Sequence, residues 1–222
     1  MRKRTKIWLV IATFLMLVGG MIFAVVMTML GWDFMKISTV KYETNHYEIG
    51  EEFENISIQT NTTDVIVVLS DNEKCEVKCY EEQLATHSVA VKDNTLTVEV
   101  NNEKSVWDHV EVNFGSPKIT VYIPKEFTIQ NVDIELSTGD VTVKDINCKG
   151  NMAIRVSTGD VYIEKSDASE IFIKTSTGDV IGSFLTEKVY TAKTNTGEID
   201  VPKSKNGGKC EIRTSTGDII IK

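Results

Sequence analysis

The chain has 222 residues, of which 41% are hydrophobic and 25% charged, and its formal net charge is −8. Without four cations within residues 2–6, it holds 20 Lys and Arg against 32 Asp and Glu, a net charge of −12. An acidic body of this kind excludes nucleic acid and anionic lipid as its main partners, because their phosphates would repel it.

The N-terminus predicts a membrane anchor. The four cations precede an uncharged run of 24 residues, Ile7–Leu30. A helix of that length extends about 36 Å and crosses a hydrocarbon core of about 30 Å. The alternative is a cleaved signal peptide, whose apolar region has about 7–15 residues. We expect a retained, single-pass signal anchor with a cytoplasmic N-terminus, because clustered cations stay on that side of the cell membrane.

This reading divides the chain into four parts. We assign residues 1–6 to the cytoplasmic N-terminus, 7–30 to the transmembrane anchor, 31–52 to a juxtamembrane stalk and 53–222 to an extracytoplasmic β-strand-repeat domain, with clear repeats over 130–222.

Strand patterns begin after the stalk. Apolar and polar residues alternate over 53–69, 74–80, 87–100 and 118–124, as expected of strands with one buried face. Within the third segment, Asp93 and Asn94 separate two alternating runs and predict a hairpin turn. No segment outside the anchor has helical periodicity.

From about residue 130 the chain repeats itself. The phrase "STGDV" and its variants place glycines 19 or 20 residues apart, a period typical of stacked repeats. Apolar residues recur seven and five positions before each glycine and two and four positions after it. Each repeat is therefore strand, tight corner, strand, and stacking would bury a shared core. The fold class is all-β, a β-solenoid or β-helix-like stack preceded by one transmembrane helix.

An earlier copy fits the same frame. Residues 56–67, "ISIQTNTTDVIV", align with the repeat when Thr63 takes the glycine position. At the other end, the chain stops on "DIIIK" without an evident polar cap. An open strand edge there leaves pairing with a second copy possible, so the oligomeric state stays undetermined.

The repeated corner has two readings. Glycine supplies a positive φ without steric cost, and short polar side chains bond the local backbone. The structural corner residues are Gly139, Gly159, Gly178, Gly197 and Gly217. The alternative is a calcium ladder, because stacked carboxylates repel one another. Its members would be Asp140, Asp160, Asp179, Glu198 and Asp218. The repeat has fewer glycines and a longer period than the repeat of calcium-binding β-rolls, and Glu198 interrupts the series of aspartates. We therefore expect turn chemistry and no bound metal or other cofactor.

A column of cations lies four residues before the corner glycines, with outward-facing parity. We call it the basic stripe, and it comprises Arg155, Lys174, Lys193 and Arg213. Each cation would either pair with a corner carboxylate or help to form a track for an anionic envelope polymer such as a teichoic acid. Exposed ion pairs are individually weak, so the first reading implies little stabilisation.

Cysteine and histidine spacing indicates no catalytic or metal chemistry. Cys75 and Cys79 lie about 13 Å apart along one strand, too far for a mutual disulfide, although a bridge elsewhere stays open. Cys148 and Cys210 are read as buried hydrophobes. His46 and His87 are isolated, and His109 lies beside Trp107 and Asp108 in a surface segment. No hydrolase or phosphate-binding motif occurs, and the repeats have no long loops. We expect no enzymatic activity.

The "STGDV" corners and the "ITVYIP" stretch at 119–124 resemble a bacterial putative-adhesin, β-strand-repeat family, a domain of unknown function. An anchor followed by repeats is similar to the membrane-anchored Gram-positive members, including those encoded with envelope-stress systems. The resemblance covers about 53–222. It implies a β-solenoid facing the cell envelope and supplies no catalytic residues.

Three functions follow from these observations. The first is a non-catalytic, adhesin-like module that binds or senses a cell-envelope polymer or a partner protein. The second is an accessory of a membrane signalling system acting through anchor and stalk. The third is an envelope-glycan enzyme, which the short repeats disfavour.

Overall fold

The computed structural model describes residues 3–33, 36, 41–83, 85–102 and 115–222. Within them the chain forms one helix and 17 strands, and helix and strands belong to two separate compact units. His109, Trp107 and Asp108, singled out above, lie outside the described residues.

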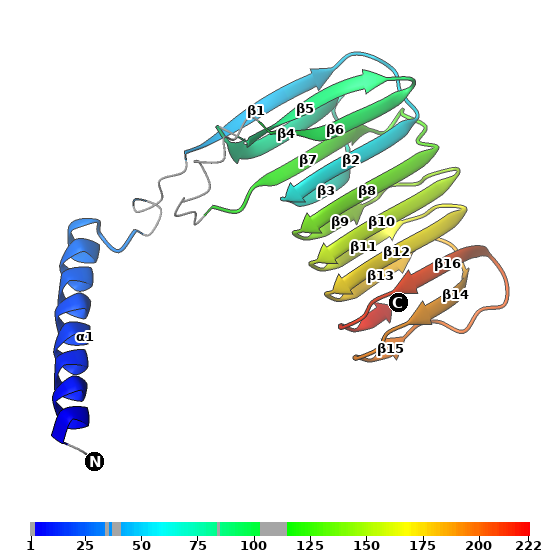
Figure 1. The fold of residues 1–222 in the computed structure, drawn as a ribbon. Coiled ribbons are helices and arrows are strands. Elements are labelled where there is room, and N and C mark those ends of the chain that lie inside the picture. Colours follow the sequence, from blue (N-terminus) through cyan, green and yellow to red (C-terminus); the bar gives the residue numbers. More distant parts are fainter. Residues whose placement is uncertain (1–2, 34–35, 37–40, 84, 103–114) are drawn as a thin grey trace. The chain divides into compact units, whose positions relative to one another are not determined.

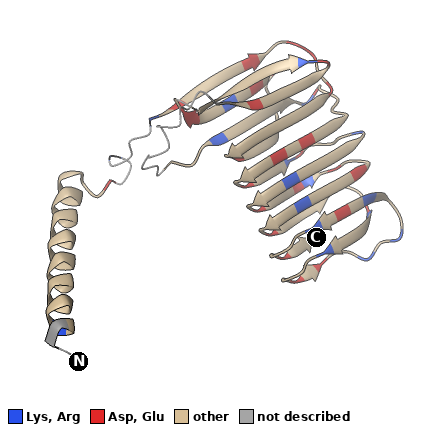
Figure 2. Ribbon diagram, in the orientation of Figure 1, with Lys and Arg blue, Asp and Glu red and all other residues tan. Residues whose placement is uncertain are grey.

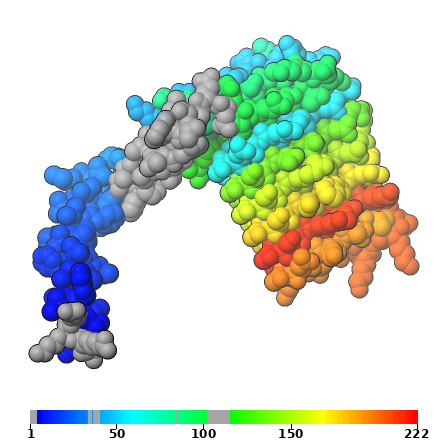
Figure 3. All heavy atoms as spheres, viewed as in Figure 1, coloured from blue at the N-terminus to red at the C-terminus, as the bar shows by residue number. Residues whose placement is uncertain are grey.

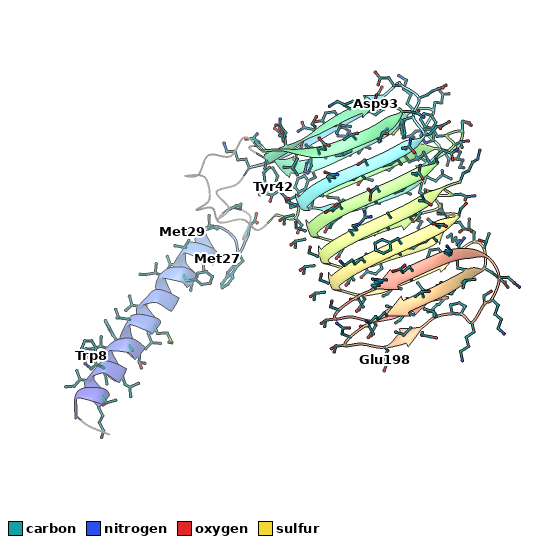
Figure 4. All side chains as sticks on the ribbon, turned by 45° about the vertical axis from the view of Figure 1, so that its right-hand side comes forward. Trp8, Met27, Met29, Tyr42, Asp93 and Glu198 are labelled. Atoms are coloured by element: carbon teal, nitrogen blue, oxygen red, sulfur yellow. The ribbon has the colours of Figure 1, made fainter. Side chains whose placement is uncertain are left out.

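Helix α1 spans Lys3–Met29 (Figure 4 labels Trp8 and Met29 on it). Its segment Thr5–Met29 has a mean hydropathy of 2.7, and its length and composition allow it to cross a membrane. Large apolar side chains such as Trp8, Phe14 and Met29 are exposed along the helix. Such a surface suits lipid contact and is costly in water.

The strands form a stack of rungs, each with one strand in each of two facing rows (Figure 1). In spatial order, the first row contains β6 (Thr95–Asn102), β2 (Asn55–Thr62), β8 (Asn131–Thr138), β10 (Asn151–Thr158), β12 (Glu170–Thr177), β16 (Gly208–Arg213) and β14 (Lys188–Lys193), with β5 (Ala85–Lys92) antiparallel to β6. The second contains β1 (Tyr42–Ile49), β4 (Cys75–Glu82), β7 (Lys118–Pro124), β3 (Asp64–Ser70), β9 (Val141–Lys144), β11 (Val161–Ser166), β13 (Val180–Phe184), β17 (Ile219–Ile221) and β15 (Ile199–Asp200). The stack confirms the solenoid-like, all-β fold.

The core lies between the rows, where the predicted apolar columns meet in register. Ile134 pairs with Ile154, and Ile154 with Ile173, and all three side chains are fully buried. Side chains from both rows form one hydrophobic cluster. A repeat that exposes an apolar stripe when alone therefore buries it against its neighbours.

The early copy of the repeat forms the first rung with a corner. Ile58 aligns with Ile134 in the first row, and Val65 aligns with Val141 in the second. On the other side of β2 in space, β5 and β6 form the expected hairpin, in which Asp93 has φ +50° and Asn94 has φ +60°. Asparagine and aspartate tolerate this left-handed conformation better than most residues.

Strand β1 lies inside the segment that we assigned to the stalk. Its residues pair antiparallel with β4 along their whole length, from Tyr42 opposite Glu82 to Ile49 opposite Cys75. The sequence "YETNHYEI" hides this strand, because its half-buried face contains polar residues. The stalk prediction was therefore too long, and residues 42–49 belong to the β-domain.

The last two repeats stack in reverse of their chain order. Strand β12 pairs with β16, and β14 pairs with the far side of β16. The C-terminal strand β17 likewise lies between β13 and β15. In Figure 3 the red C-terminal band accordingly lies between the yellow and orange bands. The C-terminus is thus inside the stack, and the edge that we expected there is formed by β14 and β15.

The terminal rung is incomplete as a hydrophobic layer. Ile199 in β15 is 46% exposed, whereas its partner Ile219 is fully buried. On β14, Lys188 turns inward and pairs with buried Asp167. Its Nζ also donates to the Ala168 carbonyl at 2.8 Å and to the Thr186 hydroxyl at 2.9 Å. An inward-pointing charge at an edge is a known device against uncontrolled strand pairing.

Candidate functional site

The corner glycines are required by close backbone approach. Their φ values lie between +130° and +145°, a region that side chains rarely adopt. At Gly178 an added Cβ would lie 2.0 Å from the carbonyl oxygen of Gly159 on the preceding rung. Thr63 takes this position on the first rung without a positive φ. Only rungs that lie on another corner therefore need glycine.

The residue after each glycine forms a hydrogen-bond ladder. The side chain on one rung accepts a bond from the backbone N–H of the corresponding residue on the next rung. In spatial order, Asp140 N–H donates to Asp64 Oδ1 at 3.1 Å, Asp160 to Asp140 at 2.9 Å, Asp179 to Asp160 at 2.8 Å, Asp218 to Asp179 at 2.8 Å and Glu198 to Asp218 at 2.7 Å.

The ladder explains its one glutamate. Glu198 belongs to the last rung, so no further corner lies beyond it to donate to its side chain (Figure 4 labels it at the opposite end from Asp93). A short aspartate is needed only where the carboxylate must reach a neighbouring N–H. Sequence reasoning missed Asp64, whose position after Thr63 was the available signal.

The same ladder bears on the calcium reading. The Oδ1 atoms of Asp140, Asp160 and Asp179 each already accept a backbone hydrogen bond. Tyr162 also donates to Asp160 Oδ2 at 3.0 Å. Among the described residues, the corner carboxylates form no group of three that could share one ion. The geometry favours the turn chemistry that we expected of them.

The basic stripe is continuous in space. Arg155 aligns with Lys174, Lys174 with Arg213, and Arg213 with Lys193, each on the next strand. Strand spacing places them about 4.8 Å apart. Figure 2 shows blue segments on the neighbouring strands β10 and β12. The reversed repeat order leaves the four cations together.

One reading of the sequence paired each stripe cation with a corner carboxylate, and this prediction was wrong. Arg155 Nη1 contacts Asp133 Oδ1 at 2.7 Å, and Arg213 Nη2 contacts Glu211 Oε1 at 2.5 Å. Within the described residues Lys174 and Lys193 have no ion pair. Lys174 therefore stands between two arginines without a carboxylate partner, which leaves positive charge available to an anion.

The surface beside the stripe is polar, with one aromatic ring. Exposed hydroxyls of Ser157, Ser176 and Ser215 lie two residues after the cations on the same face. The Phe172 ring lies 5.5 Å from the Arg155 guanidinium carbon. Cations, hydroxyls and an aromatic ring can together contact phosphate and sugar groups.

The charge column changes sign toward the first rungs. Glu99 aligns with Gln59, Gln59 with Glu135, and Glu135 with Arg155. A polar hollow of about 510 Å³ lies at this acidic end and includes Gln59, Glu99 and Glu135 in its wall. An anionic ligand on the stripe would therefore be repelled beyond Arg155, which limits the track to its four cations.

A buried polar cluster lies at this same end of the domain, and sequence reasoning missed it. Glu81 Oε2 lies 2.6 Å from His87 Nδ1, and Thr60 Oγ1 lies 2.9 Å from His87 Nε2. Asn45 Nδ2 donates to Glu81 Oε1 at 2.7 Å. Glu81 is 1% exposed and His87 6%. His87 is therefore not isolated as we had read it, and Glu81 at an inward position of "CEVKCYEE" was the signal.

The four cysteines are free thiols within the core. Burial raises the pKa of each thiol to about 12, with further contributions from acids near Cys75, Cys79 and Cys148. Cys210 lies at the inward position that the repeat frame gave it. Thiols with this pKa are unreactive at neutral pH.

The family model described as Toastrack DUF4097 matches residues 53–222. No curated protein matches the chain.

Several solved structures are similar to this chain, and one of them has a TM-score above 0.5. A putative cell adhesion protein from Clostridium sporogenes is 17% identical, with a TM-score of 0.62, over 83% of this chain and 99% of that chain. A putative adhesin from Bacteroides fragilis is 21% identical, with a TM-score of 0.40, over 82% and 97%. One from Parabacteroides distasonis is 8% identical, with a TM-score of 0.41, over 82% and 79%.

Proposed function

We propose that this chain, which belongs to the Toastrack DUF4097 family, is a non-catalytic, membrane-anchored extracytoplasmic module. Its ligand in this proposal is an anionic cell-envelope polymer. The observation that carries this proposal is the basic stripe. Its four cations lie on four consecutive strands of one face, while the rest of the body is acidic.

The spacing of the stripe suits a polymer better than a single small ion. The four in-register cations lie about 4.8 Å apart, and Lys174 and Lys193 have no ion pair among the described residues. An anionic chain lying across the strands would supply the counter-charge that these two lysines lack. A phosphate-bearing polymer offers charges at regular intervals, with sugar or polyol groups for the neighbouring serines. A wall teichoic acid or lipoteichoic acid has this chemistry.

The location follows from the N-terminal helix. We infer that α1 is retained as an anchor, with the four N-terminal cations in the cytoplasm and the β-domain outside the membrane. The name of the Clostridium sporogenes structure, a putative cell adhesion protein, is compatible with a binding role at the surface.

The test is co-sedimentation of residues 35–222 with isolated cell envelopes at low and high salt. The stripe variant replaces Arg155, Lys174, Lys193 and Arg213 with Gln. A matched control replaces Lys74, Lys118, Lys125 and Lys144, which lie on or beside strands of the second row and change the net charge by the same amount.

The proposal predicts salt-sensitive binding that the stripe variant loses and the control keeps. Equal binding by both variants would contradict it. A membrane-protein partner would instead be favoured by two results together. The β-domain would not bind envelopes at any salt concentration, and exchange of Ile7–Leu30 for an unrelated anchor would abolish cellular function.

A further inference from the structure

The strongest unassigned cluster contains a thiol, a carboxylate and an imidazole. We propose that Cys79, Glu81 and His87 form a binding site for a borderline-soft divalent metal, for which Zn²⁺ is the best fit. All three residues are buried, and one ligand atom from each lies within 4.8 Å of the others. Within the described residues no other group of His, Cys, Asp and Glu meets this condition.

The strand geometry delivers these side chains to one point. Cys79 and Glu81 are two residues apart on β4, so they point to the same face. His87 comes from β5, which pairs with β4 at Glu82–Ala85. The cluster thus spans only nine residues of sequence, and all three ligands come from two adjoining strands.

The distances fit zinc after a small rearrangement of the three side chains. Zinc bond lengths of about 2.0–2.3 Å place tetrahedral ligand atoms roughly 3.3–3.8 Å apart. The three atoms lie within 4.8 Å of one another, so a shift of about 1 Å or less collects them. The 2.6 Å contact between Glu81 Oε2 and His87 Nδ1 would open to admit the ion.

Supporting residues for such a site are already in position. Asn45 holds the second oxygen of Glu81 at 2.7 Å, and Thr60 lies 2.9 Å from the far nitrogen of His87. Outer contacts of this kind orient ligating carboxylates and imidazoles in metal sites. The fourth position would be taken by a water or by a nearby hydroxyl.

The ligand types select the metal class. Thiolate and imidazole favour zinc and neighbouring transition metals over Ca²⁺ or Mg²⁺, which prefer oxygen ligands. A divalent ion with one thiolate, one carboxylate and one neutral imidazole carries no net charge, so the filled site can be buried. On binding, the thiol of Cys79 loses its proton to solvent as its sulfur coordinates the metal.

Cys79 is the part of the cluster that hydrogen bonding leaves unexplained. A carboxylate–imidazole–hydroxyl network accounts for Glu81, His87 and Thr60 without a metal. It gives no role to the thiol. Cys75, on the same face of the same strand and equally buried, has no such cluster around it among the described residues, and it provides a matched control.

The test is Co²⁺ titration of the full chain in detergent after chelator treatment. Cobalt–thiolate coordination gives a near-ultraviolet charge-transfer band that Zn²⁺ abolishes by competition. We expect about one equivalent bound by the wild type and by Cys75→Ser, and loss of the band in Cys79→Ser. Zinc should also raise the unfolding temperature of the wild type and of Cys75→Ser, and it should leave that of Cys79→Ser unchanged.

If Cys79→Ser does not fold, His87→Gln serves instead, because it keeps the thiol and removes the nitrogen ligand. It should weaken Co²⁺ affinity at least tenfold, consistent with loss of one ligand. Absence of a thiolate band in the wild type would overturn the proposal. So would a band of equal strength in Cys79→Ser.

Discussion

Asp179 accepts a hydrogen bond on Oδ1 from the backbone N–H of Asp218 at 2.8 Å, although 39 residues separate them in sequence. The nearer repeat, which contains Glu198, is bypassed and lies beyond Asp218. This pair therefore fixes the spatial order of the last rungs. The same order brings Arg213 next to Lys174 and completes the basic stripe.

The ladder predicts that aspartate matters by position and not by charge. Asp179→Ala leaves the N–H of Asp218 without its acceptor and should cost about 1–3 kcal/mol of unfolding free energy. Asp179→Asn keeps an acceptor oxygen and should cost less. Glu198→Ala, at the end of the ladder, should stay within about 0.5 kcal/mol of wild type. Urea unfolding measures all three, and equal losses at both positions would refute the ladder.

The corner glycines predict a large backbone effect. Gly178→Ala places a side chain at φ +142° and 2.0 Å from the Gly159 carbonyl oxygen. The unfavourable φ costs roughly 1–3 kcal/mol by itself, and displacement of the neighbouring rung adds to it. Gly50→Ala is the control, because an added Cβ there meets nothing within 4 Å and its φ lies outside the left-handed region. Equal thermal midpoints for the two variants would be inconsistent with this packing.

The buried pair at the terminal rung predicts a strong single-site effect. Lys188→Met leaves Asp167 buried without its cation and should destabilise the domain by about 3–5 kcal/mol. Adding Asp167→Asn should recover much of the loss. Lys193→Met, on the exposed face of the same strand, should have little effect. Chemical unfolding of the four proteins gives the comparison, and no recovery in the double variant would argue against charge as the cause.

The thiols predict slow alkylation and a loss of stability in alkali. A pKa of about 12 leaves roughly one thiol in 10⁴ ionised at pH 8, so native protein should react with iodoacetamide only as it unfolds. Because the folded-state pKa exceeds that of the unfolded chain, the stabilisation is complete below about pH 9 and decreases as pH rises toward 12. Mass spectrometry counts the labels, and rapid labelling of any native thiol would show that it is accessible.

Much of the fold could be predicted from residue periodicity. The columns containing Ile134, Ile154 and Ile173 identified the inward face, and Thr63 marked an extra rung. These features are local to one repeat, or shared by all repeats, so the sequence carries them directly. The Asp93–Asn94 turn is local in the same sense.

The order of the rungs could not be predicted in this way. Both of the last two repeats fit the apolar columns, so the pattern does not distinguish which one contacts β12. Ala192 replaces the isoleucine of its column and Glu198 replaces the aspartate of the ladder. These two differences identify the terminal rung only once the hydrogen-bond ladder is known. The cluster of Glu81 and His87 was missed for a related reason, because its members come from different strands.

The central claim is that the basic stripe binds an anionic polymer. The most direct test is the dissociation constant of residues 35–222 for poly(glycerol phosphate) of defined length, measured at several salt concentrations. The account predicts that affinity falls as salt rises, that the stripe variant weakens binding at least tenfold, and that the matched lysine control stays within twofold of wild type. Equal affinity of the stripe variant and the control would contradict the account.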